Sequence, residues 1–251
     1  MDVYEYKQEF QVRHCESDFK HTLKTSIALS YMQEVACASA DELGYGYQYL
    51  WTKGYSFIIA NICCEFCKPI RLGDRMQIKT WPLPPSHVIF GREYQFLSLT
   101  GEILANASSR WCLLDMTNGK LLSSKVLVEQ DYSKYNTTKV LNGIQWKIPV
   151  FSLAEGELCF SIKIANSEYD HNMHVNNTRY ADYCMNCFSV EELSKRFISR
   201  FQITYVKQCK EGEVLRFYRK QVAEEEYLVQ GVNELEETVV TAKIHFSFDG
   251  E

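Results

Sequence analysis

Residues 16–43 have the sequence ESDFKHTLKTSIALSYMQEVACASADEL, and residues 166–193, which lie 150 positions later, have the sequence NSEYDHNMHVNNTRYADYCMNCFSVEEL. The two stretches align without gaps, and four strand-like runs separated by turn sequences such as LTGE and KEGE follow each of them. We therefore expect each half to form a strand, a helix of about four turns and four antiparallel strands. The identical pairs in the alignment include Ser17 and Ser167, His21 and His171, and Cys37 and Cys187.

The helix predicted over residues 26–42 has a face of small and apolar side chains. Ala28, Met32, Val35, Ala36 and Ser39 follow the i, i+3, i+4 spacing of such a face. Small side chains let a curved sheet approach the helix closely. A helix wrapped by an antiparallel sheet, present twice in one chain, predicts the α+β class and a double hotdog fold.

The predicted N-terminal hotdog domain covers residues 1–130, and the C-terminal hotdog domain covers residues 144–251. Residues 131–143 between them are polar and without periodicity, which is typical of a linker. The two halves would stand side by side as a covalent pseudo-dimer. We expect either a monomer of this kind or a homodimer.

The composition is that of a globular protein, with 46% hydrophobic and 24% charged residues. The net charge of −5 argues against nucleic acid as a partner, because nucleic-acid binding requires a basic face. No apolar run approaches the ~18 residues that span a bilayer. The N-terminus lacks the features of a signal or transit peptide, so we expect a cytoplasmic protein with no membrane partner.

Ten cysteines include two CxxC pairs, Cys64 with Cys67 and Cys184 with Cys187. The gap between the pairs is far longer than the spacing of a zinc ribbon. We therefore expect reduced thiols and neither a metal nor another cofactor.

Polar residues crowd the segment YDHNMHVNNTRYADY, residues 169–183, just ahead of the second predicted helix. In an extended approach to that helix, Asp170, Asn172 and His174 project to one side. A purely structural helix cap would be equally useful in both halves. The first half lacks the acid, amide and imidazole, and this difference between the halves favours a catalytic function. In the alignment the three residues stand opposite Lys20, Thr22 and Lys24.

The helix is expected to begin near Val175 to Asn177, with Asn176 or Asn177 as its N-cap. The first N–H groups of a helix are unpaired and carry the positive end of its dipole, so they can stabilise an oxyanion. An acid, an amide and an imidazole beside them could hold and deprotonate a water molecule. This combination suits hydrolysis of an activated acyl group.

The motif DHNMHVNNTRY, residues 170–180, resembles the D-x-N-x-H-V-N-N-x-x-Y signature of the plant and bacterial acyl-acyl carrier protein thioesterases. The first half resembles the same family in SYMQEVACASADELGYG, LGDRMQIKTWP and WCLLDMTNGK, and the similarity extends from Tyr4 to Phe248. The resemblance implies a double hotdog that hydrolyses fatty acyl thioesters on the phosphopantetheine arm of acyl carrier protein, in fatty acid biosynthesis. It also implies catalytic roles for Asp170, Asn172 and His174.

The sequence departs from this family at one position. The family has a Y-x-x-E-C pattern on the strand after the C-terminal helix, and here Tyr205 to Cys209 read YVKQC. Gln208 cannot accept a proton, so the general base must be Asp170 or His174, although its amide could still orient a water molecule. Cys209 could be the nucleophile, or a water molecule held by Asp170 could attack the substrate directly. Cys209 could also be a cysteine that only packs beside the site. Of the two attacking groups we favour water.

The expected substrate-binding residues come from both halves. Asn176, Asn177 and Tyr180 belong to the motif, whereas Trp51 and Phe57 could line an acyl pocket or belong to the core.

Lys195, Arg196 and Arg200 follow the second helix. They could dock the acidic carrier protein or form an ordinary solvated turn. Two alternative functions stay open, an acyl-CoA thioesterase on the same fold and a non-catalytic acyl-thioester-binding protein.

Overall fold

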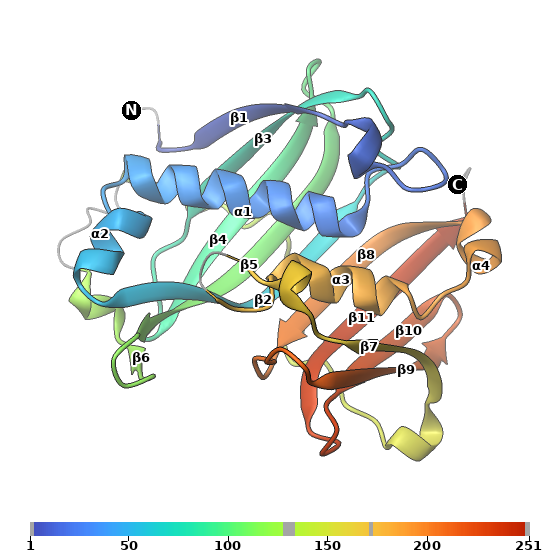
Figure 1. Cartoon of the computed structure of the whole chain (residues 1–251). Coiled ribbons are helices and arrows are strands. Elements are labelled where there is room, and N and C mark those ends of the chain that lie inside the picture. Colours follow the sequence, from blue (N-terminus) through green and yellow to red (C-terminus); the bar gives the residue numbers. More distant parts are fainter. Residues whose placement is uncertain (1–2, 128–133, 171–172, 249–251) are drawn as a thin grey trace.

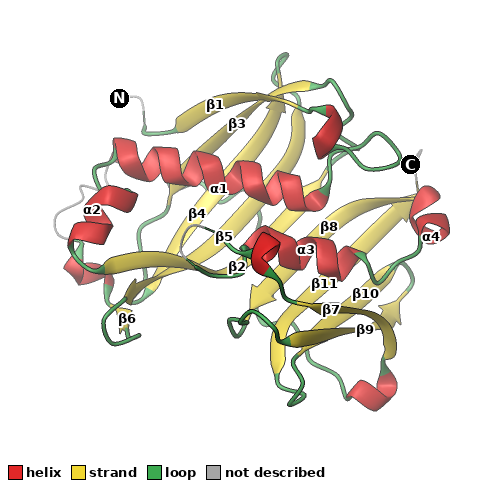
Figure 2. Cartoon of the chain, in the orientation of Figure 1, coloured by secondary structure: helices red, strands yellow, loops and turns green. Residues whose placement is uncertain are grey.

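The computed structural model describes residues 3–127, 134–170 and 173–248. Its two halves contain the same series of elements, except that the first half ends in one additional short strand (Figures 1 and 2). The first half consists of β1 (Tyr6–Gln11), α1 (Thr25–Glu42), α2 (Tyr47–Thr52), β2 (Tyr55–Phe66), β3 (Arg75–Pro82), β4 (Ile89–Ser98), β5 (Ile103–Asp115) and β6 (Leu121–Leu122). The second half consists of β7 (Glu157–Lys163), α3 (Asn177–Met185), α4 (Val190–Ser194), β8 (Arg196–Tyr205), β9 (Val214–Ala223), β10 (Glu226–Val232) and β11 (Thr238–Phe248).

All the strands belong to one antiparallel sheet whose order is the same from either end. It runs β1-β3-β4-β5-β2-β8-β11-β10-β9-β7, with β6 paired to β5. The halves meet where β2 pairs with β8, with Cys63 opposite Gln202 at the centre of an approximate two-fold axis. Asn61 donates a hydrogen bond to Thr204 Oγ1 there at 2.8 Å.

Helices α1 and α3 lie on one side of this sheet and contact each other between the halves (Figure 1). The small apolar face predicted for α1 is confirmed. Ala28 and Val35 are completely buried, and Met32, Ala36 and Ser39 are also buried. The sheet can therefore curve closely around the helix, and the chain is the predicted α+β double hotdog.

The prediction of a second helix of about four turns is wrong. Helix α3 has nine residues, and a separate helix of five residues, α4, follows it. The break has a local cause, because the Ser189 hydroxyl accepts a hydrogen bond from Glu192 N–H and the Glu192 carboxylate accepts one from Ser189 N–H. This capping box starts a new helix where the sequence pattern suggested a continuous one.

The segment between the halves runs along the sheet and bonds to both halves. Val140 N–H donates to the buried Glu93 carboxylate at 2.9 Å, and Trp81 Nε1 donates to Thr138 O at 3.0 Å. Gln202 of the second half donates to Gln145 O at 2.8 Å. The predicted linker begins at residue 131, so its first part lies outside the described residues.

No helix among the described residues is both long enough and apolar enough to cross a lipid bilayer.

Candidate functional site

The residues before α3 form a tight turn. Tyr169 pairs with Val175 in an antiparallel bridge, and Asp170 N–H donates to His174 O at 2.8 Å. The Asp170 carboxylate accepts a hydrogen bond from His174 N–H at 3.3 Å, and Met173 has a φ angle of 59°. The turn thus places Asp170 and His174, both half-buried, at the entrance to α3.

Asn176 is the N-cap of α3, as one of the two alternatives predicted. Its side-chain oxygen accepts hydrogen bonds from Thr178 N–H and the Thr178 hydroxyl, both at 2.9 Å. Asn177 is the first residue of the helix, and its N–H has no acceptor among the residues that the structure describes. Tyr205 fixes this end of the helix by donating to Asn177 O at 3.1 Å.

The same turn occurs before α1. Ser17 pairs with Leu23, and Asp18 N–H donates to Thr22 O at 2.8 Å. The Asp18 carboxylate accepts from Thr22 N–H at 2.9 Å, and His21 has a φ angle of 60°. Each of these contacts has its counterpart in the turn before α3, so the two turns are equivalent.

The equivalence corrects the sequence alignment by two residues. Helix α3 begins at Asn177 and α1 at Thr25, an offset of 152 rather than 150. Asp170 therefore has a counterpart, Asp18, and the prediction that it lacks one is wrong. The two turns differ where His174 stands in place of Thr22.

The gapless alignment had the wrong offset because it was based on scattered identities such as Cys37 with Cys187. The correct offset was visible as a pattern of Glu, Asp and Tyr that the sequence analysis missed. It consists of Glu16, Asp18 and Tyr31 in the first half and Glu168, Asp170 and Tyr183 in the second.

Asn172, predicted as the third catalytic residue, lies outside the described residues together with His171. The structure therefore leaves the Asn172 prediction untested.

Gln208 and Cys209 lie in the loop after β8, which ends at Tyr205, and not on the strand where they were expected. The loop passes beside the site turn, because Glu211 N–H donates to Tyr169 Oη at 2.6 Å. Gln208 is exposed, whereas Cys209 is only 1% exposed. This leaves Gln208, unlike Cys209, accessible to solvent near the turn.

Burial raises the pKa of the Cys209 thiol, and a hydrogen bond with Tyr180 lowers it by less. The thiolate is the nucleophilic form of cysteine, so a raised pKa disfavours nucleophilic attack by Cys209. Tyr180 itself is buried in the core of the second half, where its ring packs edge-on against Tyr205.

A cavity of about 10 Å³ lies at the start of α3. Asn177 and Thr178 line it from the second half together with Tyr205, and Leu29, Met32 and Gln33 line it from α1. The candidate site therefore lies between the two halves. Its remaining walls are Ile59, Ile62, Tyr94 and Trp111 of the first-half sheet.

A second cavity, of about 80 Å³, continues along α1. Ala36, Cys37 and Ala40 line it, and they extend the helix face that lines the first cavity. Trp111 lines both cavities, and its Nε1 donates a hydrogen bond to Ser109 Oγ at 2.7 Å. Sequence reasoning missed Trp111, because a single aromatic residue in a strand gives no sign that it lines two cavities.

The two aromatic residues predicted for an acyl pocket separate in the structure. Phe57 lines the second cavity and packs edge-on against Phe90 at 5.0 Å. Trp51 lies on α2, is 63% exposed and stacks on Tyr47, away from both cavities.

The predicted basic cluster is largely neutralised by ion pairs. Arg196 pairs with Glu225 at 3.1 Å, and Arg200 pairs with Glu65 at 2.8 Å. Lys195 is the exposed cation of this segment.

Comparison with known proteins matches both halves of the chain. Residues 3–132 match the acyl-ACP thioesterase N-terminal domain, and residues 155–249 match the acyl-ACP thioesterase C-terminal domain. The chain is 22% identical over 233 residues to oleoyl-acyl carrier protein thioesterase 1, chloroplastic, of Arabidopsis thaliana. It is 24% identical over 221 residues to the chloroplastic palmitoyl-acyl carrier protein thioesterase of Gossypium hirsutum.

These alignments cover 85% and 84% of the chain but only 63% and 54% of the respective relatives, so the chain spans part of their length. Two crystal structures share its fold with a TM-score of 0.87. An acyl-ACP thioesterase from Bacteroides thetaiotaomicron is 20% identical, with 97% of this chain and 98% of that chain covered. The 12:0-ACP thioesterase from Umbellularia californica is 16% identical, with 98% of each chain covered.

Proposed function

Because the chain belongs to the acyl-ACP thioesterase family, we propose that it hydrolyses a fatty acyl thioester of acyl carrier protein to the free fatty acid and the carrier thiol. The observation that carries this proposal is the position of the Asp170–His174 turn. An acid and an imidazole stand together at the helix N-terminus that lines the cavity between the two halves.

In the proposed reaction, a water molecule attacks the thioester carbonyl carbon and gives its proton to Asp170 or His174. The carbonyl oxygen becomes an oxyanion, and the free N–H of Asn177 at the positive end of α3 can donate to it. The tetrahedral intermediate then expels the thiolate, which takes the proton. Asn172 and Gln208 would orient the water, because an amide can donate and accept hydrogen bonds but cannot take a proton.

The acyl chain would extend from this site along α1. The face formed by Met32, Ala36 and Ala40 leads from the first cavity to the second, where Phe57 forms part of the wall. Acyl carrier protein is the proposed partner that delivers this chain. Of the three basic residues after α4, Lys195 would be available to contact the acidic carrier protein, because Arg196 and Arg200 are ion-paired with glutamates.

The decisive experiment compares Asp170→Asn with Asp18→Asn. Asparagine keeps a side-chain oxygen that can accept the hydrogen bond closing either turn, but it cannot act as a base. We expect Asp170→Asn to lower kcat/KM on acyl-ACP by at least about 100-fold, the usual size of a general-base contribution. Asp18→Asn makes the same change in the equivalent turn and should leave kcat/KM close to the wild-type value.

The panel of substrates should include acyl-ACP and acyl-CoA thioesters of several chain lengths. Hydrolysis of neither carrier would contradict the enzymatic proposal, and faster hydrolysis of acyl-CoA would contradict the proposed carrier. Equal losses in Asp170→Asn and Asp18→Asn would show that the carboxylates act only in folding, which thermal unfolding of both variants would reveal.

A further inference from the structure

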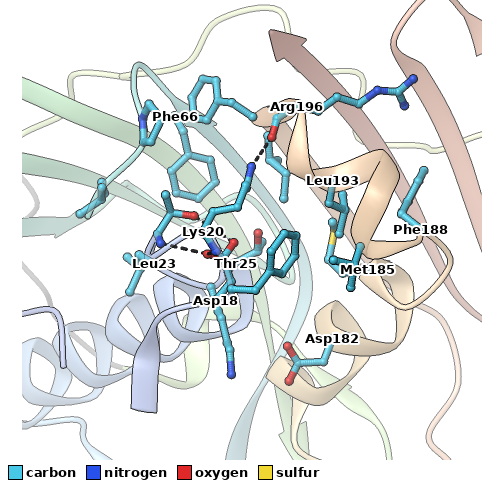
Figure 3. Close-up of a pocket in the computed structure, with 18 of the residues that line it drawn as sticks. Asp18, Lys20, Leu23, Thr25, Phe66, Asp182, Met185, Phe188, Leu193 and Arg196 are labelled. Atoms are coloured by element: carbon cyan, nitrogen blue, oxygen red, sulfur yellow. Dashed lines mark hydrogen bonds between the residues drawn. The ribbon is translucent and has the colours of Figure 1, made fainter. Parts of the chain in front are cut away.

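A cavity of about 290 Å³, larger than the two already described, does not lie at the Asp170–His174 turn. It lies between the Asp18–Thr22 turn of the first half and helices α3 and α4 of the second (Figure 3). The approximate two-fold axis relates it to the candidate reaction site. Thr25 and Phe66, which line the large cavity, correspond to Asn177 and Tyr205, which line the small one.

The walls of this cavity are mostly apolar, and one end of it carries an ammonium group. Half-buried Lys20 extends across it and donates to the Arg196 main-chain oxygen (Figure 3). This contact uses one of three N–H donors, and no carboxylate pairs with the Lys20 ammonium among the described residues. The apolar lining includes Phe66, Ile70, Met185, Phe188, Leu193 and Ile198.

Neither of the two carboxylates that line the cavity, Asp18 and Asp182, forms an ion pair with the Lys20 ammonium. Asp18 uses both oxygens within its own turn, accepting from Lys20 N–H, Thr22 N–H and the Thr22 hydroxyl. Asp182 lies at the opposite end of the cavity from the Lys20 ammonium (Figure 3). The cavity therefore combines an apolar body with a cationic end.

We propose that this cavity binds a single-chain carboxylate of the free fatty acid class. The carboxylate accepts hydrogen bonds from Lys20 Nζ, and the alkyl chain lies along the apolar wall. Thr22 stands here where His174 stands in the other half, so the site binds an acyl chain without an imidazole to assist its cleavage. A free fatty acid is also the product of the proposed hydrolysis. Identifying the bound molecule with this product rests on the proposed function, whereas the binding site itself does not.

Calorimetric titration with dodecanoate tests the site through two substitutions. Lys20→Met removes the ammonium, and Val190→Glu introduces a negative charge at an exposed position that lines the cavity. Lys20→Met should raise Kd by about tenfold, the value of one charged hydrogen bond. Val190→Glu should also raise Kd, because its carboxylate repels the carboxylate of dodecanoate. Val190→Gln is the neutral control and should bind dodecanoate like the wild type, and dodecanol binding should be insensitive to all three changes. Equal dodecanoate affinities in all four proteins would overturn the proposal.

Because the reaction site could also hold dodecanoate, a second experiment locates it. A dodecanoate analogue with a photoreactive diazirine should label residues 185–198, and Val190→Glu should suppress this labelling while Val190→Gln retains it. Labelling confined to α1 and β5 would contradict the assignment. Neither experiment requires hydrolysis, so failure of this proposal is distinguishable from failure of the proposed function.

Discussion

Glu16 is a buried carboxylate held by three hydrogen bonds in the first half. Arg13 donates through its guanidinium at 2.5 Å and its N–H at 2.8 Å, and the Tyr31 hydroxyl donates at 2.5 Å. The Arg13 side-chain bond is the largest cause that lowers the Glu16 pKa to about 2. In the second half, Glu168 accepts the equivalent main-chain bond from Ala165 N–H, and its other hydrogen bond comes from the exposed Ser167 hydroxyl.

We expect Glu16→Gln to lower the free energy of unfolding at neutral pH by about 2 kcal/mol. The folded-state pKa lies below the unfolded value, so this stabilisation is complete above about pH 4.5 and disappears as the pH falls towards 2. Urea unfolding from pH 7 to pH 3 measures the difference from wild type. Glu168→Gln is the control, and a Glu16→Gln deficit that stays constant over this range would contradict the assignment.

The tyrosines at equivalent positions of the two halves, Tyr31 and Tyr183, also differ. Tyr31 donates to Glu16, whereas its counterpart Tyr183 has a buried hydroxyl with no hydrogen-bond partner among the described residues. Tyr183→Phe removes an unsatisfied polar atom, so it should leave the free energy of unfolding unchanged or raise it by up to about 1 kcal/mol. Tyr31→Phe should lower it by about 1.5 kcal/mol. Urea unfolding compares the two variants, and a clear loss of stability in Tyr183→Phe would show that its hydroxyl is bonded in solution.

The turns before α1 and α3 show what a sequence can and cannot reveal at a site. The motif around Asp170 and His174 was recognisable, and Asn176 was one of the two N-caps predicted. The role of Asp170 in closing the turn was not recognisable, because it depends on backbone hydrogen bonds that Asp18 repeats in the first half. At the correct offset His174 stands against Thr22 and Asn172 against Lys20, and the equivalent hydrogen bonds of the two turns established this offset.

At the scale of elements, α1 was predictable because its small buried face and its length are local properties of the sequence. The second helix was not, since a capping box at Ser189 and Glu192 ends one helical segment and begins another. The offset between the halves is 152 residues at the helix starts and 139 at the central pair Cys63 and Gln202. A gapless alignment cannot represent this change.

Trp111 lines both cavities along α1, so we expect its bulky side chain to limit the length of the acyl chain. Trp111→Leu should join the cavities and raise the kcat/KM ratio of longer to shorter acyl-ACP substrates by about tenfold, as a few buried methylenes would. A competition assay with acyl-ACPs of different chain length measures this ratio. Trp146→Leu, which changes a tryptophan stacked on Arg110, is the control. An unchanged preference in folded Trp111→Leu would mean that the acyl chain takes another path.

A single strand pair, β2 with β8, joins the two halves into one sheet. Repetition in the sequence indicated two similar units, but strand propensity does not specify which edges of two sheets join. The structure joins them through β2 and β8, with Glu65 opposite Arg200 and Asn61 opposite Thr204. Buried residues of both halves, including Met32 and Cys184, belong to one apolar core. The halves are therefore expected to be interdependent in folding.

Cleaving the connection between Asn142 and Gly143 tests this interdependence. Both residues are exposed, and Gly143 has a φ angle of 68°. Expressed together, the pieces 1–142 and 143–251 should assemble, because the β2–β8 pairing, the common core and the Gln202–Gln145 contact do not require a continuous chain. Expressed alone, each piece would expose the β2 or β8 edge and its side of the core, and we expect it to aggregate. Affinity capture of a tagged first piece, followed by gel filtration, measures the assembly. A folded, monodisperse piece obtained alone would show that the halves are independent domains.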